Sequence, residues 1–391
     1  MGSILLLCDE QNGIGLARRL AQNGTVCKVY APDQNCLLNT TNPTVIGKLT
    51  MLEQYDIILN QTHHCESLPY AMTNSPFCQL VEHNFKYFQT FAEVAKLQTP
   101  LFQHVDTPTA LPQRGERLHL EPLHGTDRSG YSFDTLTTEN TPITTLAVSQ
   151  SGVLPALLYT LPEGVRCYVT GWFNGEDFAF FTLSFLNLRD HDGERGPQAL
   201  PHRSRGRITL ALPACDLIKP FLNLNPFLKR VDFWGPLTLE FHVSASGILL
   251  LRAIPRFFVY ETFELFKQSE FDLLWQLKTK QALTPSDQYA ISISLLCYSY
   301  PGVAVLNPDE GAEKHLFLDN IGEAKSIASS DLWLGQATAR SHTIHEARRR
   351  AYRTIHNITL CSDVFYRTDI GCDVEAKISQ LKEWGVIHAA A

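Results

Sequence analysis

The chain has 391 residues, a net charge of −7, 44% hydrophobic residues and 19% charged residues, which is typical of a globular protein with a full core. The negative charge gives no electrostatic case for a nucleic-acid partner or an anionic membrane surface, and no apolar run could span a bilayer. The first residues lack the basic segment of a signal peptide and the ten cysteines form no CxxC pair, so we expect a cytoplasmic protein with reduced thiols.

The first elements in chain order are a strand, a turn with two glycines, a helix and a second strand. The apolar run 4–8 precedes Gly13 and Gly15, a helical pattern follows, and 26–30 is again apolar. This order predicts a βαβ unit of a parallel sheet. Such a turn can hold a phosphate at the helix N-terminus, but tight turns also use glycine for steric reasons, and we favour the steric interpretation.

The next elements are a buried strand at 55–60 and a helix at 85–96. Between them, His63, His64 and Cys65 carry atoms that ligate metals. Adjacent ligands without a second cluster at useful spacing are weak evidence for a metal, so a polar loop is favoured here.

The middle of the chain contains two predicted hairpins. One spans 164–181 around Asn174-Gly175, and the other spans 233–261 around a turn at 244–247. Before them, the pattern of residues 119–133 predicts a strand, a glycine-containing loop and a second strand. After them we expect a helix at 263–277 and a strand at 290–298.

The C-terminal part of the chain carries several short motifs in a fixed order. They are Tyr300-Pro301-Gly302, the run 332–335, a helix at 344–355 rich in alanine and arginine, and Tyr366–Gly371. Together with the hairpin at 233–261, these motifs resemble the ATP-grasp ligases, and most closely the phosphoribosylamine–glycine ligases. The resemblance covers nearly the whole chain and is weakest over 134–163.

The resemblance implies a magnesium site on the second hairpin, where the family presents carboxylates and an asparagine to metal-bound ATP. In this chain one carboxylate, Glu240, is retained as a metal ligand. The second carboxylate position is Arg252 and the asparagine position is Ile254. The fold is therefore expected to be retained, and the magnesium site is expected to be damaged.

The resemblance also implies a nucleotide site. In the family a lysine before the glycine-containing loop contacts phosphate, and here its position is Glu121. The loop itself would offer Gly125, Arg128, Ser129 and Gly130, unless it is a plain turn, which we rate as equally supported. The family's acidic pair at the adenine hinge corresponds to Thr170-Gly171 in this chain. Glu176 corresponds to an acid that contacts the ribose of the nucleotide in the family; the alternative is that Glu176 is a solvated carboxylate of the hairpin turn.

Two interpretations of the reversed charges at Glu121 and Arg252 stay open. In the first, the two side chains pair across the cleft and hold it closed to ATP. In the second, Arg252 replaces the metal and contacts phosphate directly. The other residues that the resemblance assigns to catalysis are Arg256 and the pair Asp190 and His191, which remain from a longer Asp-His-Lys-Arg run.

The fold class implied is α/β (α+β), an ATP-grasp fold with an N-terminal parallel βαβ domain and a small β-rich C-terminal domain. The boundaries expected are 1–98 for the N-terminal domain, 99–165 for the lid subdomain, 166–285 for the core subdomain and 286–391 for the C-terminal domain.

Two classes of function follow, and we favour the first. In the first, the protein has lost glycine-ligase activity and binds a ligand or a protein partner in a scaffolding or regulatory role. In the second, it is an ATP-dependent carboxylate–amine ligase that works through an acyl phosphate on another substrate. Its ligands would be ATP with magnesium and a small carboxylate or amine. Fold alone does not decide between these classes.

Overall fold

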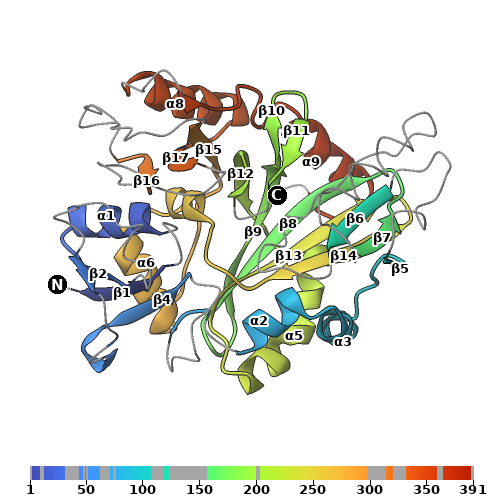
Figure 1. Cartoon of the computed structure of the whole chain (residues 1–391), viewed down its shortest axis with the longest axis horizontal. Helices are drawn as coiled ribbons and strands as arrows, with labels where there is room; N and C mark the ends of the chain where they lie inside the picture. Colours follow the sequence, from blue (N-terminus) through green and yellow to red (C-terminus); the bar gives the residue numbers. More distant parts are fainter. Residues whose placement is uncertain are drawn as a thin grey trace.

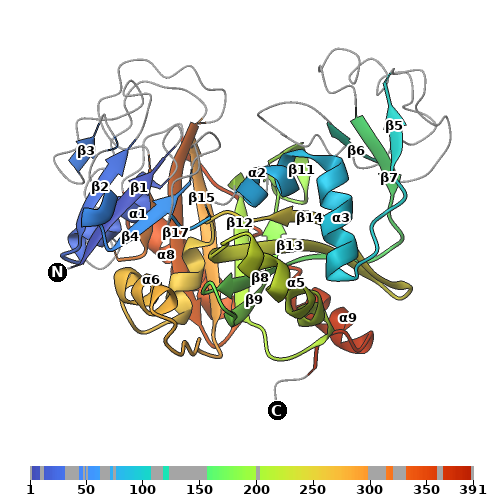
Figure 2. The ribbon, with the colours of Figure 1, turned by 90° about the horizontal axis from the view of Figure 1, so that it is seen from below.

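The computed structural model describes residues 2–8, 13–30, 44–46, 49, 52–61, 71–73, 76–106, 118–122, 156–199, 203–297, 314–319, 332–358 and 364–388 (Figure 1). Within these ranges the chain forms one parallel sheet of four strands and three antiparallel arrangements of three, two and nine strands. The parallel sheet and the three-stranded sheet lie at opposite ends of the nine-stranded one (Figure 2). The expected mixed α/β class is confirmed.

The parallel sheet is built from the first part of the chain, in the order β3, β2, β1, β4. Central strand β1 is buried on both sides, which explains its unbroken apolar run. The predicted βαβ unit is therefore confirmed. The elements of this part are β1 (Ser3–Leu7), α1 (Ile14–Gln22), β2 (Val26–Tyr30), β3 (Thr44–Ile46), the 3₁₀ turn η2 (Leu52–Gln54) and β4 (Ile57–Asn60).

The two glycines before α1 meet two different constraints. Gly13 has a φ of +99°, in the left-handed region that favours glycine. A Cβ on Gly15 would lie 2.7 Å from backbone atoms of Phe317 and Leu318 in β16 (Leu316–Leu318). The steric interpretation of this turn therefore accounts for both glycines.

The three-stranded sheet has the order β5, β7, β6 and consists of β5 (Gln103–Val105), β6 (Leu118–Pro122) and β7 (Ala156–Thr160). The chain passes from it to the nine-stranded sheet at 161–164, directly before β8 (Val165–Phe173). Thr170 and Gly171, which correspond to the acidic pair at the family's adenine hinge, lie in β8, and that correspondence stays a prediction. Thr170 is fully buried in the middle of β8, where its hydroxyl shares a 2.8 Å hydrogen bond with that of Thr238.

The nine-stranded sheet has the order β14, β13, β8, β9, β12, β15, β17, β16, with β18 paired to β15. Strands expected in the core and C-terminal domains thus share one sheet, and the four domain boundaries stay a prediction. Its further strands are β9 (Phe178–Asn187), β12 (Gly206–Ala211), β13 (Gly235–Ser244), β14 (Gly247–Ile254), β15 (Tyr289–Cys297), β17 (Leu332–Ser341) and β18 (Val364–Phe365). A separate hairpin pairs β10 (Arg189–His191) with β11 (Arg195–Gln198).

The two faces of the large sheet differ in chemistry. In β13, Leu237, Leu239, Phe241 and Val243 point into the main apolar core, while the alternate residues Thr238, Glu240 and His242 face the other side. The apolar face is covered by α2 (Pro76–His83), α3 (Phe85–Ala95), α5 (Lys219–Arg230) with the turn η6 (Asp216–Ile218) before it, α8 (Ile344–His356) and α9 (Val374–Glu383).

One predicted helix is divided. Instead of a single helix at 263–277, the structure has the 3₁₀ helix η7 (Tyr260–Leu265) and the α-helix α6 (Glu270–Lys278). Ser269 starts the second helix, because its hydroxyl accepts the backbone N–H of Asp272. The helices expected at 85–96 and 344–355 are confirmed as α3 and α8.

Candidate functional site

Glu240 lies in the middle of the polar face, with a polar residue opposite it on each side. Tyr168 is its partner in β8 and Arg252 is its partner in β14. The position of Arg252 depends on a β-bulge, because the register of β13 and β14 shifts after Glu240 and leaves Leu251 without an opposite residue. Bulges re-aim side chains in this way and are common beside active sites.

The Glu240 carboxylate is fully buried, with 0% of its side chain exposed, and three side chains approach it. Arg166 donates its Nε–H to Oε1, and the Tyr168 hydroxyl donates to the same oxygen at 2.8 Å. Arg252 Nε lies 3.8 Å from Oε2. The side chains of Arg166 and Arg252 keep 24% and 15% exposure. We call these four residues the Glu240 cluster.

The charges within the Glu240 cluster fix its protonation. Burial raises the pKa of Glu240, but the guanidiniums of Arg166 and Arg252 outweigh burial and hold that pKa below its usual range. Burial, and then the carboxylate, raise the pKa of Tyr168 well above its ordinary value, so the phenol stays a donor. At neutral pH the cluster therefore carries two positive charges and one negative charge.

The described residues do not fit a magnesium ion at this place. Magnesium takes several oxygen ligands in near-octahedral geometry. Arg252 stands where a second carboxylate would be needed, and Ile254 is part of an apolar core. Among the residues that the structure describes, no group of three His, Cys, Asp or Glu side chains could hold a metal. The expectation that Glu240 is a metal ligand gains no support from its neighbours.

Several residues predicted to bind the nucleotide lie outside the described part of the chain. Gly125, Arg128, Ser129 and Gly130 belong to this group. His63, His64 and Cys65, which were considered as metal ligands, also lie outside the described residues. For Glu121, the structure places only the backbone, in β6, so its pairing with Arg252 stays a prediction.

Glu176 lies in the turn between β8 and β9, and its carboxylate accepts a hydrogen bond from Lys280. With 63% of its side chain exposed, it has the surroundings of a solvated hairpin carboxylate. A contact between Glu176 and a ribose therefore stays a prediction that the geometry does nothing to support.

The residues predicted to take part in catalysis have different partners. Arg252 belongs to the Glu240 cluster, whereas Arg256, after β14, donates to Glu82 of α2 at 2.5 Å. Asp190 of β10 accepts from Arg205 Nε at 2.6 Å, and its neighbour His191 is exposed. The structure thus supports a role for Arg256 and Asp190 in joining elements together.

The retained motif Tyr366–Gly371 joins the C-terminal part of the chain to the hairpin of β10 and β11. Arg367 is buried and pairs with Asp369 at 2.7 Å and with Glu194 at 2.8 Å. It also donates to the backbone carbonyl of Arg189 at 2.9 Å. The motif therefore acts in packing, because it holds the C-terminal part of the chain against β10 and β11.

Sequence analysis missed three polar side chains that the fold makes important. Arg166 and Tyr168 alternate in β8, and that alternation would have placed them on one face once β8 was paired with β13. The third, Asp319, directly follows β16 and is 2% exposed. Its Oδ1 accepts the backbone N–H of Gly15 at 2.8 Å, so a carboxylate sits at the start of α1. No local pattern in the sequence indicates this contact.

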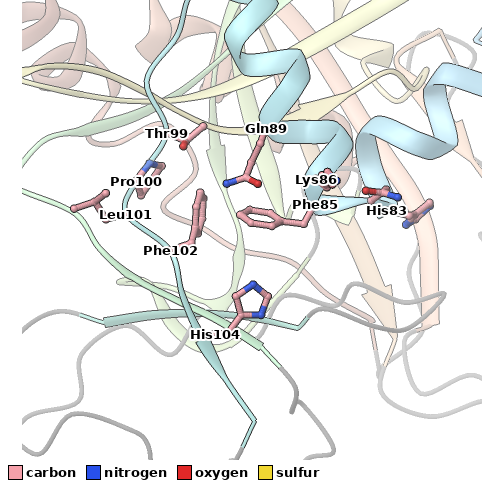
Figure 3. A pocket seen from close by; sticks show the side chains of 10 residues that line it. His83, Phe85, Lys86, Gln89, Thr99, Pro100, Leu101, Phe102 and His104 are labelled. Atoms are coloured by element: carbon pink, nitrogen blue, oxygen red, sulfur yellow. The ribbon is translucent and has the colours of Figure 1, made fainter.

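A surface groove of about 810 Å³ lies beside the start of α3, where the chain runs from Thr99 toward β5 (Figure 3). Phe85 and Phe102 meet there edge to face, with ring centroids 4.9 Å apart, and Leu101 is 95% exposed. None of the lining residues is a buried charged group. The groove therefore offers apolar and hydrogen-bonding contacts without a reactive centre.

No protein-family model and no curated protein matches the sequence, but solved structures do match the fold. Phosphoribosylamine–glycine ligase from Thermotoga maritima superposes with a TM-score of 0.69 at 15% identity, over 94% of this chain and 99% of that chain. N5-carboxyaminoimidazole ribonucleotide synthetase from the same organism gives 0.59 at 14% identity, over 93% and 100%. N5-carboxyaminoimidazole synthetase from Staphylococcus aureus complexed with ADP gives 0.55 at 14% identity, over 91% and 97%.

These matches span more than nine tenths of the chain, so it has the ATP-grasp fold that its motifs predict. At 14–15% identity the likeness concerns the fold alone. Within the described ranges, none of the helices has the length and apolar content needed to cross a membrane.

Proposed function

We propose that this ATP-grasp protein binds an anionic ligand, with a nucleotide as the first candidate, without magnesium and without glycine-ligase activity. The observation that carries the proposal is Arg252. It stands at a position where the family resemblance calls for a metal-binding carboxylate, and it lies 3.8 Å from the one carboxylate that remains, Glu240.

The loss of ligase chemistry follows from what the metal does in phosphoryl transfer. Magnesium neutralises the phosphates and holds the transferred group in line with its acceptor. A guanidinium supplies positive charge and planar hydrogen bonds, but it has no open coordination positions. Replacing carboxylate by arginine therefore favours binding of a phosphate over its transfer.

The charge of the Glu240 cluster supports an anionic ligand. Arg166 and Arg252 contribute two positive charges against the single negative charge of Glu240. Both side chains keep partial exposure, so an anion can approach them while Arg166 stays hydrogen-bonded to Glu240. Arginine is suited to this task because it recognises phosphate and carboxylate groups with paired hydrogen bonds.

The nucleotide is the first candidate because one protein with this fold, that of Staphylococcus aureus, was solved in complex with ADP. A small carboxylate or amine is the second candidate ligand, and a protein partner is a further one. As part of the same proposal we place the protein in the cytoplasm, where its free cysteines would stay reduced.

Calorimetric titration tests the proposal. ATP and ADP are titrated first with magnesium and then with excess chelator. We expect the same affinity in both conditions, at least a tenfold loss in Arg252→Met, and no change in Arg349→Met, which alters an exposed arginine of α8. Absence of binding in both conditions would overturn the nucleotide proposal.

A second assay addresses the ligase alternative. The protein is incubated with ATP, magnesium and mixtures of amino acids and amines, and released phosphate is measured. We expect no release above the level of an Arg252→Met control. Release that depends on both magnesium and an amino acid would identify an active carboxylate–amine ligase and overturn the proposed loss of ligation.

A further inference from the structure

The surface groove beside the start of α3 has one wall that is held at both of its ends. This wall is the segment 99–102, which lines the groove. Before it, the carbonyl of Gln98 accepts the backbone N–H of Leu250 at 2.8 Å, and after it the chain enters β5, which pairs with β7. Pro100 restricts the backbone between these two ends. The groove therefore does not depend on an occupant for its shape.

Aromatic rings line the groove (Figure 3). Phe85 and Phe102 meet edge to face, and Phe85 also meets the ring of His104 edge to face, with centroids 6.2 Å apart. Phe102 packs in the same way on Tyr159 of β7, with centroids 5.2 Å apart. Both phenylalanines pack against the main apolar core and are only partly buried. Rings that are fixed in this way give a rigid apolar surface, which is typical of the centre of a protein contact site.

Leu101 also lines the groove, and 95% of its surface is exposed. Among the described residues, the next most exposed large apolar residue is Leu222 of α5, at 54%. An exposed apolar residue beside an aromatic groove is typical of a surface that another protein covers, because covering it removes apolar area from water. Since nearly all of Leu101 faces water, a chain segment that crosses the groove covers it better than a small molecule does.

The described residues that line the groove carry no negative charge. Lys86 is exposed and positive, and the imidazoles of His83 and His104 are either neutral or positive. The described lining contains no aspartate or glutamate, although the whole chain has a net charge of −7. This local difference favours a partner segment with negative charge at the groove, because the charges of the two surfaces are then complementary.

We propose that this groove binds a peptide segment of a protein partner in which a large apolar side chain stands next to an aspartate or glutamate. The apolar side chain packs on Phe85 and Phe102, and the segment covers Leu101. The acidic residue pairs with Lys86 at the start of α3. This inference is independent of the proposed function, because none of these residues belongs to the Glu240 cluster.

Selection from a phage library of random peptides on the immobilised full chain tests the inference. We expect enriched sequences in which Phe, Leu or Trp stands beside Asp or Glu. A labelled synthetic peptide of such a sequence is then titrated by fluorescence polarisation. Its Kd should rise at least tenfold in Leu101→Ala and about threefold in Lys86→Gln. The matched controls Leu222→Ala on α5 and Lys382→Gln on α9 also change exposed side chains and should leave the Kd unchanged.

The other outcomes count against the inference. Enrichment of basic peptides, a Kd that is unchanged in Leu101→Ala, or no enrichment at all would overturn it. Phenylacetate, a small apolar acid, is added as a competitor, and displacement of the peptide at micromolar phenylacetate would identify a small-molecule site in place of a peptide site. Both variants change exposed side chains, so their circular dichroism spectra should match that of the wild type.

Discussion

Two buried carboxylates of this protein, Glu240 and Asp319, stand in opposite electrostatic environments. Glu240 is held by two guanidiniums and a phenol on the large sheet. Asp319 accepts hydrogen bonds from backbone N–H groups at the start of α1 and from the indole N–H of Trp333, and the charge of Arg18 acts on it from nearby. The pKa of Glu240 is lowered, whereas burial raises the pKa of Asp319 to about 6 in spite of its hydrogen bonds.

The comparison shows that burial does not fix the charge of a carboxylate; the formal charge of its neighbours does. Neutral donors form hydrogen bonds with the oxygens of Asp319, but they do not fully offset the free energy lost when its charge is removed from water. At Glu240 two cations do so, and the group stays ionised. The first carboxylate is therefore a permanent part of a charged cluster, and the second is a group whose ionisation costs stability.

The largest effect is expected from Glu240→Gln. This substitution leaves Arg166 and Arg252 without their carboxylate in a poorly solvated place, which should lower the free energy of unfolding by about 3–5 kcal/mol. Urea unfolding at pH 7 measures the loss. A loss below about 1 kcal/mol would show that the cluster behaves as a surface ion pair, and the contrast with Asp319 would then fail.

The second effect concerns the pH dependence of stability in Asp319→Asn. Because the folded pKa of about 6 exceeds the ordinary value of 3.8, folded wild type binds more protons than the unfolded chain between these values and loses stability as pH rises through them. The free energy of unfolding of Asp319→Asn minus that of wild type should therefore increase by up to about 3 kcal/mol between pH 4 and pH 7. Urea titrations at both pH values measure this difference, and a constant offset would contradict it.

A third, smaller effect separates the two arginines of the Glu240 cluster. Arg166 makes a direct hydrogen bond to Glu240, while Arg252 lies 3.8 Å away. We expect Arg166→Met to lower the free energy of unfolding by about 2 kcal/mol and Arg252→Met by about 1 kcal/mol. If Arg252→Met lowers the free energy of unfolding more than Arg166→Met does, Arg252 and not Arg166 is the main partner of Glu240.

The smallest effect is expected at a partly exposed carboxylate with exposed partners, which serves as the baseline. Glu346 on α8 bonds Arg349 and Arg350, and these bonds lower its pKa to about 2. Because water screens such pairs, Glu346→Gln should leave the urea midpoint unchanged within error. A clear loss in this variant would mean that the effects at Glu240 do not depend on burial.

Much of the fold could be predicted because local patterns agree with the final sheets. The alternation of Leu237, Leu239 and Phe241 gives the second hairpin, and the order of strand, glycine turn and helix gives the parallel sheet. The hairpin also brings Glu240 near Arg252, but the bulge that sets these two residues opposite each other does not follow from the sequence.

The rest could not be predicted, because it depends on contacts between distant parts of the chain. Arg166 is 74 residues from Glu240, and Gly15 is 304 residues from Asp319. Spacing within one segment carries no information about such pairs. The position of Thr170 has the same cause, since only the pairing of β8 with β13 shows that this residue is in the middle of a sheet.

The hydrogen bond between Gly15 and Asp319 can form only late in the synthesis of the chain. A ribosome adds about 5–20 residues per second, so the 304 residues between these two positions take roughly 15–60 s to make. The backbone N–H of Gly15 therefore gains its carboxylate partner only after most of the chain has been made.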